Sequence, residues 1–203
     1  QYDRTLIIVT ADHGEMLGDR YIWAKSTYHD AAYHVPLIIR DPDLPGSFGA
    51  VHDLPTESID VTPTILDRFG LEVPQTMNGR SLMPMLRGER PREWRRFTFS
   101  ELDFGDPVAP TLPQKRLGLT PETTNLAVLR SGRHTLVHFN GGLPSLLFDH
   151  DRHGEMRDIS GDPDAQSALL EMYRAMADHR MTHAASRFTR TMVTGEGAVT
   201  VPR

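Results

Sequence analysis

The stretch TLIIVTADHGE, residues 5–15, is the part of the sequence from which the fold class is predicted. Its first six residues are mostly β-branched and are apolar on both faces, which is typical of a central parallel strand in a sheet that is covered on both sides. Residues 35–39 form a second apolar run before the turn-rich segment DPDLPG, and they are predicted as another strand of the same sheet. We therefore predict an α/β fold in which ADHGE lies at the carboxyl end of the sheet, where ligands bind in such folds.

The segment after this sheet is predicted to hold one short helix. Residues 61–69 place apolar side chains on one helical face, with Asp60 as the N-cap and Gly70 as the C-terminal stop. Residues 75–96 contain a short apolar piece followed by a charged stretch. We expect them to form a connector that crosses the surface, with residues 87–96 as a solvated or inter-domain surface.

The second half of the chain predicts a small antiparallel sheet. Four short β-rich runs are separated by glycine-containing turns, at residues 97–102, 125–130, 135–139 and 146–149. A helix from about residue 163 to 182, with Asp162 as its N-cap, is expected to cover one face of that sheet through Met172 and Met176. These patterns divide the chain into three parts. Residues 1–96 are the α/β part with its connector, residues 97–183 are an antiparallel β subdomain with its helix, and residues 184–203 are an arm or tail.

Composition excludes several classes of function. The chain has 203 residues and a net charge of -5, which argues against a nucleic-acid partner or an anionic membrane partner. No apolar run approaches the roughly 20 residues that span a bilayer, so we expect a soluble, cytoplasmic protein. Because there is no cysteine, the chain can form no disulfide, no thiolate zinc site and no cysteine nucleophile.

Asp12 and His13 are the most informative candidates for chemistry. A carboxylate and an imidazole side by side suit a divalent ion, and Gly14 permits a tight turn that turns both side chains toward one point. Spacing alone weighs this metal site equally against Asp12 as a helix cap beside a partly buried histidine. Lys25 follows twelve residues after His13, and a lysine ammonium can neutralise an anionic substrate oxygen, although in isolation it reads as a solvated loop lysine.

Three longer stretches resemble one family. TLIIVTADHGEMLGDRYIWAKSTYHDAAYHVPLIIRDP at residues 5–42 resembles the late metal-ligand segment of the sulfatase family, within the alkaline phosphatase superfamily. The amino-acid sequence of this stretch is similar to that of bacterial phosphonate monoester hydrolases and related arylsulfatases. ESIDVTPTILDRFG with MNGRSLMPMLRG, and LPSLLFDHDRHGEMRDISGDP, are similar to the following helix, connector and C-terminal signature of that family.

The resemblance implies roles for the candidates named above. Asp12 and His13 would ligate one divalent metal ion (Ca, Mn or Mg), and Lys25 would contact the transferred sulfuryl or phosphoryl group or the leaving oxygen of an anionic ester substrate. In this family the nucleophile is a hydrated formylglycine made from a Cys-x-Pro-Ser-Arg motif, which this chain lacks. The resemblance therefore implies the C-terminal part of an alkaline-phosphatase-like mixed sheet, in a sulfuric ester or phosphonate monoester hydrolase whose formylglycine lies in a missing N-terminal part.

Other readings stay open at this level. The chain alone is expected to be inactive and to self-associate or bind an N-terminal partner half, with residues 184–203 as an arm. It could instead be a non-catalytic association module. A phosphomutase-like or phosphodiesterase relative with a serine or threonine nucleophile is a third reading. The helical pair His179 and His183 is discounted as a metal site because it lies at an exposed helix end.

Overall fold

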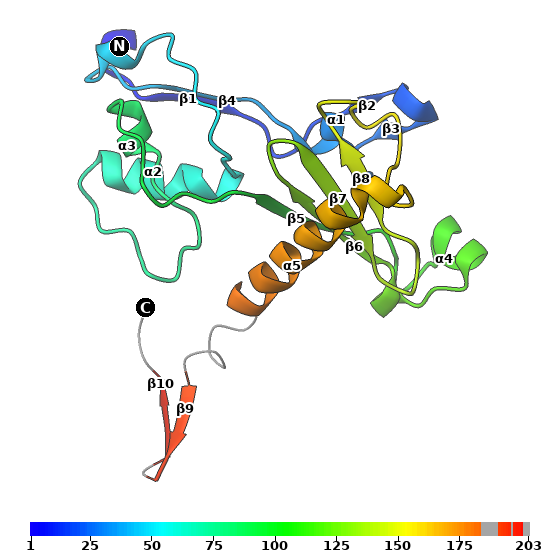
Figure 1. Ribbon diagram of the computed structural model, residues 1–203. Coiled ribbons are helices and arrows are strands. Elements are labelled where there is room, and N and C mark those ends of the chain that lie inside the picture. Colours follow the sequence, from blue (N-terminus) through cyan, green and yellow to red (C-terminus); the bar gives the residue numbers. More distant parts are fainter. Residues whose placement is uncertain (184–190, 196, 201–203) are drawn as a thin grey trace.

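The computed structural model describes residues 1–183, 191–195 and 197–200. Figure 1 shows two groups of elements joined by strand β5: a narrow two-stranded ribbon with two short helices beneath it, and a four-stranded sheet with a long helix across it. The described part of the chain is therefore a mixed α/β structure with antiparallel sheets and a C-terminal helix, which is the predicted class. Among the described residues, no helix is both long enough and apolar enough to span a bilayer.

The prediction of a central parallel strand at residues 5–10 is wrong for the described chain. β1 (Ile7–Thr10) pairs antiparallel with β4 (Leu37–Arg40), and these two strands form a sheet of their own. The link between them holds a small hairpin and a four-residue helix, and such a helix is too short for a crossover that would make them parallel. The strands are also not covered on both faces, since Val9 is 49% and Ile38 61% exposed. An apolar run predicts a strand, but it does not give the direction of its partner.

The link between β1 and β4 brings together three short elements. β2 (Met16–Leu17) and β3 (Trp23–Ala24) form an antiparallel hairpin around the 3₁₀ turn Asp19–Tyr21. The helix α1 (Asp30–Tyr33) then leads back toward β4. These elements lie over the four-stranded sheet in Figure 1.

The helix after this ribbon forms as predicted, but the role of Asp60 differs. α2 (Val61–Arg68) follows the 3₁₀ turn Ser58–Asp60. The Asp60 carboxylate does not cap α2: it accepts the backbone N–H groups of Glu57 at 2.9 Å and Arg80 at 2.8 Å and pairs with the guanidinium of Arg95. Asp60 is fully buried, so this pair compensates a charge that would otherwise be unpaired in the interior.

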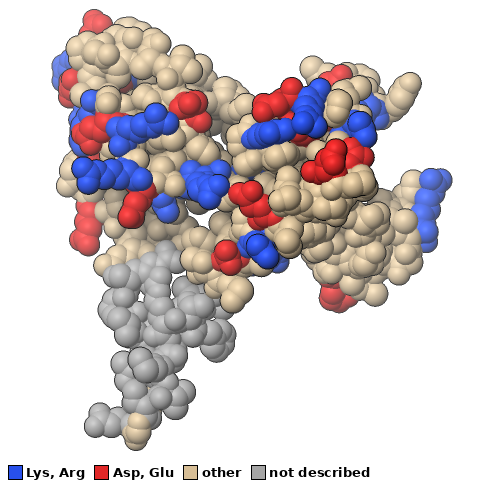
Figure 2. All heavy atoms as spheres, viewed as in Figure 1, with Lys and Arg blue, Asp and Glu red and all other residues tan. Residues whose placement is uncertain are grey.

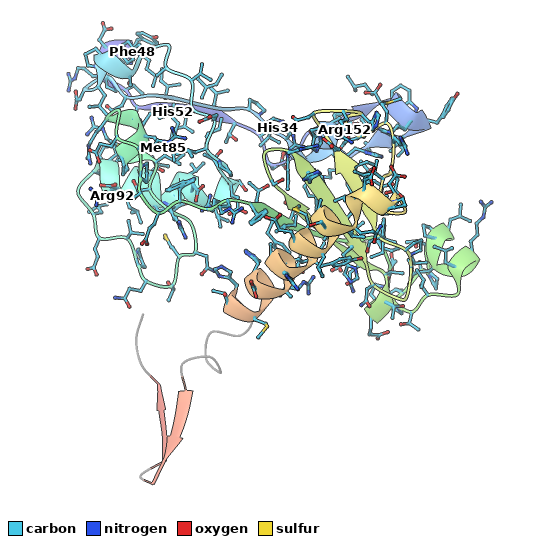
Figure 3. The ribbon with its side chains drawn as sticks, in the orientation of Figure 1. His34, Phe48, His52, Met85, Arg92 and Arg152 are labelled. Carbon is cyan, nitrogen blue, oxygen red and sulfur yellow. The ribbon has the colours of Figure 1, made fainter. Side chains whose placement is uncertain are left out.

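The connector is partly buried rather than a surface crossing. α3 (Met83–Leu86) packs against α2, and Figure 3 labels Met85 of α3 close to α2. Leu82, Met83 and Met85 are each less than 5% exposed. The sequence predicts a solvated or inter-domain surface at residues 87–96, and Arg95 departs from the solvated alternative: its side chain is 11% exposed and is held by Asp60 and Glu57. The sequence does not distinguish Arg95 from the neighbouring arginines, because its pairing with Asp60 and Glu57 depends on the tertiary fold.

The predicted antiparallel meander is confirmed. Its strands are β5 (Thr98–Asp103), β6 (Asn125–Arg130), β7 (His134–Phe139) and β8 (Leu146–Asp149), and they lie in chain order with every pair antiparallel. The link from β5 to β6 contains α4 (Leu112–Leu117), which the sequence analysis does not predict. Thr111 caps α4 by accepting the N–H of Gln114, and Gly118 ends it in the left-handed conformation at φ 65°.

Alternation along these strands gives the sheet two buried faces. On one face, α5 (Gln166–His183) lays Met172 and Met176 against Ala127, Leu129, Leu136 and Leu147, as predicted. On the other face, Tyr28 and Tyr33 pack against a second cluster formed by Leu126, Val128, Val137 and Phe148. Complete burial of each large apolar side chain contributes about 1.5–3 kcal/mol, so this second cluster fixes the segment around α1 on the sheet.

The last part of the chain contains a hairpin that periodicity does not reveal. β9 (Thr191–Thr194) pairs antiparallel with β10 (Gly197–Thr200). The rest of the expected arm, residues 184–190, 196 and 201–203, lies outside the described residues. On the face drawn in Figure 2, acidic and basic side chains are interspersed over the described elements.

Candidate active site

Asp12 and His13 follow β1 directly and lie close to each other. The backbone N–H of His13 donates to Asp12 Oδ1 at 3.0 Å, and Asp12 Oδ2 lies 3.5 Å from His13 Nε2. The Asp12 side chain is 84% exposed and the His13 side chain 35% exposed. The two side chains therefore converge on one solvent-accessible point.

The ring of His13 is oriented by its own loop. Nδ1 lies 2.7 Å from the carbonyl oxygen of Gly14, and a carbonyl can only accept a hydrogen bond. Nδ1 therefore carries the proton, and in the neutral ring Nε2 presents a lone pair. This arrangement, in which the second nitrogen is held by a backbone carbonyl, is the one that metal-binding histidines commonly have.

Lys25 joins this pair from the end of the β2–β3 hairpin. Its Nζ lies 2.7 Å from His13 Nε2, so the ammonium donates to that lone pair. Ala24, immediately before it, has a left-handed backbone at φ 67°, which is uncommon for a residue with a side chain. The Lys25 carbonyl accepts the N–H of Thr27 at 2.8 Å, which turns the chain toward α1.

Gly14 is required for a reason other than the tight turn that the sequence suggested. Its N–H donates to the carbonyl of Ala32 in α1 at 2.9 Å, and a Cβ at this position would lie 2.0 Å from the carbonyl oxygen of Ala31. The backbone of the His13 loop thus rests directly on α1. Only glycine permits this approach.

The structure adds residues that sequence reasoning did not select. Glu155, in the turn after β8, accepts the N–H of Asp30 at 2.9 Å and contacts Nδ1 of His29 at 3.2 Å. Burial alone would raise the pKa of the Glu155 carboxyl, but the hydrogen bonds from His29 and Asp30 and the charge of Arg20 outweigh it and hold that pKa below its ordinary value. The only sequence signal was the position of Glu155 within the C-terminal signature, and His29 had no metal-like spacing.

A second ion pair joins the same helix to the sheet. The carboxylate of Asp30 pairs with the guanidinium of Arg130 at the end of β6. Nε2 of His150 lies 3.3 Å from Arg130 Nη1 and 2.7 Å from Thr135 Oγ1. Burial, assisted by the Arg130 charge, lowers the pKa of His150.

The turn that carries Glu155 is itself held by a buried carboxylate. Asp149 accepts two hydrogen bonds from Arg133, at 3.2 and 2.8 Å, and one from the backbone of Asp151 at 3.1 Å. The hydrogen bonds from Arg133 lower the pKa of Asp149 from 3.8 to about 2. Figure 3 shows Arg152 of this turn on the same side of the molecule as His34, at the end of α1.

Asp12 and His13 have the chemistry of ligands for a divalent metal ion. Asp12 offers an exposed carboxylate and His13 a correctly held imidazole, both of which suit a divalent ion. Within the described residues no group of three or more histidine, cysteine or acidic side chains could hold a metal ion. The single lone pair of Nε2 binds one partner at a time, so a metal ion would compete with Lys25 for it.

Comparison with known proteins gives the family. The sulfatase family model matches residues 1–71. The chain is 38% identical over 203 residues to the multifunctional alkaline phosphatase superfamily protein PehA of Trinickia caryophylli, covering 98% of this chain and 39% of that protein. It is 42% identical over 90 residues to the choline-sulfatase of Rhizobium meliloti (strain 1021), covering 42% of this chain and 17% of that protein.

Solved structures agree over the whole chain. The phosphonate monoester hydrolase SpPMH from Silicibacter pomeroyi superposes with a TM-score of 0.89 and 51% identity, covering 100% of this chain and 40% of that one. The phosphonate monoester hydrolase of Agrobacterium radiobacter superposes with a TM-score of 0.85 and 38% identity, with the same coverage. The chain thus spans about two fifths of the length of these relatives and has the fold of their C-terminal part. It belongs to the sulfatase family of the alkaline phosphatase superfamily.

Proposed function

We propose that this chain is part of a metal-dependent hydrolase of sulfate or phosphonate esters, in which Asp12 and His13 hold the metal and Lys25 binds the anionic ester. The observation that carries the proposal is the convergence of these three side chains: Lys25 Nζ lies 2.7 Å and Asp12 Oδ2 3.5 Å from the same nitrogen of His13. The family and the named activities of the relatives support the reaction class.

Each side chain has a distinct part in this proposal. The Gly14 carbonyl holds the His13 ring so that Nε2 is free of a proton, and Asp12 brings a negative charge beside it. When bound, the divalent ion lowers the pKa of a nucleophile and stabilises charge on the group under attack. Lys25 adds a compact positive charge that neutralises an oxygen of the tetrahedral anion. Sulfate esters and phosphonate esters share this anionic, tetrahedral character, so both belong to the proposed substrate class.

The nucleophile is proposed to lie outside these 203 residues. A formylglycine made from cysteine cannot come from this chain, because the chain has no cysteine. The two ligands identified here likewise leave positions on the metal for donors from elsewhere. The proposal therefore assigns this chain one half of the metal site and the anion-binding lysine.

Metal binding tests the proposal directly. Titration calorimetry with Mn²⁺, Ca²⁺ and Mg²⁺ on the 203-residue chain is expected to show weak binding that Asp12→Asn and His13→Gln abolish. His153→Gln, in the exposed turn after β8, is the matched control and is expected to bind as the wild type does. Equal binding by all of these proteins, or no binding by the wild type, would overturn the assignment.

A further inference from the structure

Glu155 contacts residues that lie before and after Lys25 in the chain. After Lys25, its two oxygens contact His29 Nδ1 at 3.2 Å and the N–H of Asp30 at 2.9 Å. Before Lys25, the guanidinium of Arg20 on the β2–β3 hairpin lies 4.0 Å from Glu155 Oε2. One carboxylate of the C-terminal subdomain thus holds both ends of the segment that presents the lysine.

The contact is buried and charged. The side chains of Glu155 and His29 are 11% and 6% exposed. The pKa of Glu155 is held below its ordinary value, so the carboxylate is ionised and acts only as an acceptor. Nδ1 of His29 therefore carries a proton and donates to it. A partner of this kind is costly to remove, since the remaining donors would be left buried without an acceptor.

A continuous set of contacts leads from Glu155 to His13. Glu155 fixes the N–H of Asp30, the first residue of α1. Ala32, in the same short helix, supports Gly14, whose N–H donates to the Ala32 carbonyl. Gly14 in turn accepts from Nδ1 of His13 and so sets the ring orientation. Each link joins groups that are directly hydrogen-bonded or adjacent in the chain.

The hairpin side carries a parallel link. Arg20 and Tyr21 have left-handed backbones, at φ 56° and 60°, which the surroundings must hold in place. The guanidinium of Arg20 meets both Glu155 and, at 3.8 Å, the sulfur of Met156. The turn at residues 155–156 therefore restrains the hairpin from which Lys25 extends.

We propose that Glu155 is a positioning residue that sets the distance between Lys25 and His13. It touches neither group, and it acts through α1 on the histidine side and through the hairpin on the lysine side. Loss of its charge frees the Lys25 segment, weakens the donation from Nζ to Nε2 and releases the His13 ring. The effect on metal affinity rests on the proposed function, whereas the effect on the His13 ring does not.

Two readouts on the 203-residue chain test this role. Nitrogen-15 NMR of the imidazole rings is expected to show His13 protonated on Nδ1 in the wild type and as a mixture of tautomers in Glu155→Gln. Titration with Mn²⁺ is expected to show a net loss of affinity, because release of the His13 ring, which usually costs at least about tenfold, outweighs the roughly fivefold gain from a weaker Lys25 contact. Glu155→Asp, which keeps the charge on a shorter side chain, is expected to recover part of both signals.

Controls separate positioning from general damage. Glu171→Gln removes an exposed carboxylate that lies 3.5 Å from Arg96, and it is expected to leave both readouts unchanged. If Glu155→Gln does not fold, Arg20→Gln, which removes only the hairpin link, replaces it and is expected to shift the same signals less. A folded Glu155→Gln with the wild-type His13 spectrum would overturn the positioning role. If the wild type binds no Mn²⁺, the proposed function fails, and the His13 spectrum alone decides the role of Glu155.

Discussion

The ammonium of Lys25 donates to Nε2 of His13 across 2.7 Å, on the one nitrogen that a metal ion would use. A metal ion at this nitrogen would therefore have to displace the lysine. Under the proposed function, the displaced ammonium would then be available to the anionic ester.

Removal of Lys25 is therefore expected to tighten metal binding. Lys25→Met takes away both a competing donor and a like charge, and a charged hydrogen bond screened by solvent is worth about 1 kcal/mol, or about fivefold in affinity. Calorimetry with Mn²⁺ measures the change. Lys115→Met, the only other lysine and an exposed residue of α4, is the control. Unchanged or weaker binding by Lys25→Met would contradict the competition.

Gly14→Ala is expected to destabilise the fold and to disturb the His13 ring. The added methyl would lie 2.0 Å from the Ala31 carbonyl oxygen, so α1 or the His13 loop must move. Such overpacking costs about 1–3 kcal/mol. Urea denaturation measures it against Gly132→Ala, where a Cβ meets nothing within 4 Å. Equal midpoints for the two variants would show that the loop does not rest on α1.

The stability contributed by Asp149 is expected to depend on pH. Its pKa falls from 3.8 to about 2 on folding, so the stabilisation is complete above about pH 4 and is lost as the pH falls toward 2. At pH 7 Asp149→Asn is expected to unfold at lower denaturant than the wild type, and the difference is expected to shrink below pH 4. Asp151→Asn, a 68% exposed neighbour, is expected to show little change at either pH. A difference independent of pH would exclude ionisation of Asp149 as the cause.

The purified 203-residue chain is expected to hydrolyse neither an aryl sulfate nor a phenylphosphonate ester. Two metal ligands hold an ion weakly, and a formylglycine nucleophile cannot form where there is no cysteine. A chromogenic assay with added Mn²⁺ checks this. Metal-dependent turnover that disappears in Asp12→Ala would show that the chain is a complete catalyst.

Self-association is expected through the ribbon of β1 and β4. Val9 and Ile38 are cross-strand neighbours, and they are 49% and 61% exposed. Exposed apolar pairs on a two-stranded sheet favour contact with another surface. Sedimentation equilibrium is expected to give a mass above 22.8 kDa that Ile38→Lys reduces. A monomer at micromolar concentration, unaffected by Ile38→Lys or by deletion of residues 184–203, would contradict this expectation.

Local sequence patterns predicted much of the secondary structure, because helices and hairpins form between residues that are close in the chain. Short β-rich runs with glycine-containing turns between them predicted the β5–β8 meander, and the helical spacing of Met172 and Met176 predicted the face of α5 that covers it. The direction of β4 relative to β1 was not predictable, since a run that is apolar on both faces pairs equally well either way. The sequence placed Asp12 and His13 by their position after a strand, and the structure brings Lys25 to them.

Long-range contacts account for what the sequence analysis missed. An acidic residue in a charged turn is expected to be solvated. The Glu155 side chain is nevertheless only 11% exposed, and it contacts His29, which is 126 residues away in the chain. Arg95 likewise looked like one of several surface arginines until it met Asp60. Neither pairing has a local signature, so each became visible only once the fold brought the segments together.

The contact between Glu155 and His29 also affects the order of events during synthesis. His29 leaves the ribosome 126 residues before Glu155, so the loop that carries Lys25 waits for most of the chain before its anchor exists. Folding of such non-local contacts is slow compared with that of neighbouring segments. The nascent chain therefore carries the loop of Lys25 without its Glu155 contact until translation has passed residue 155.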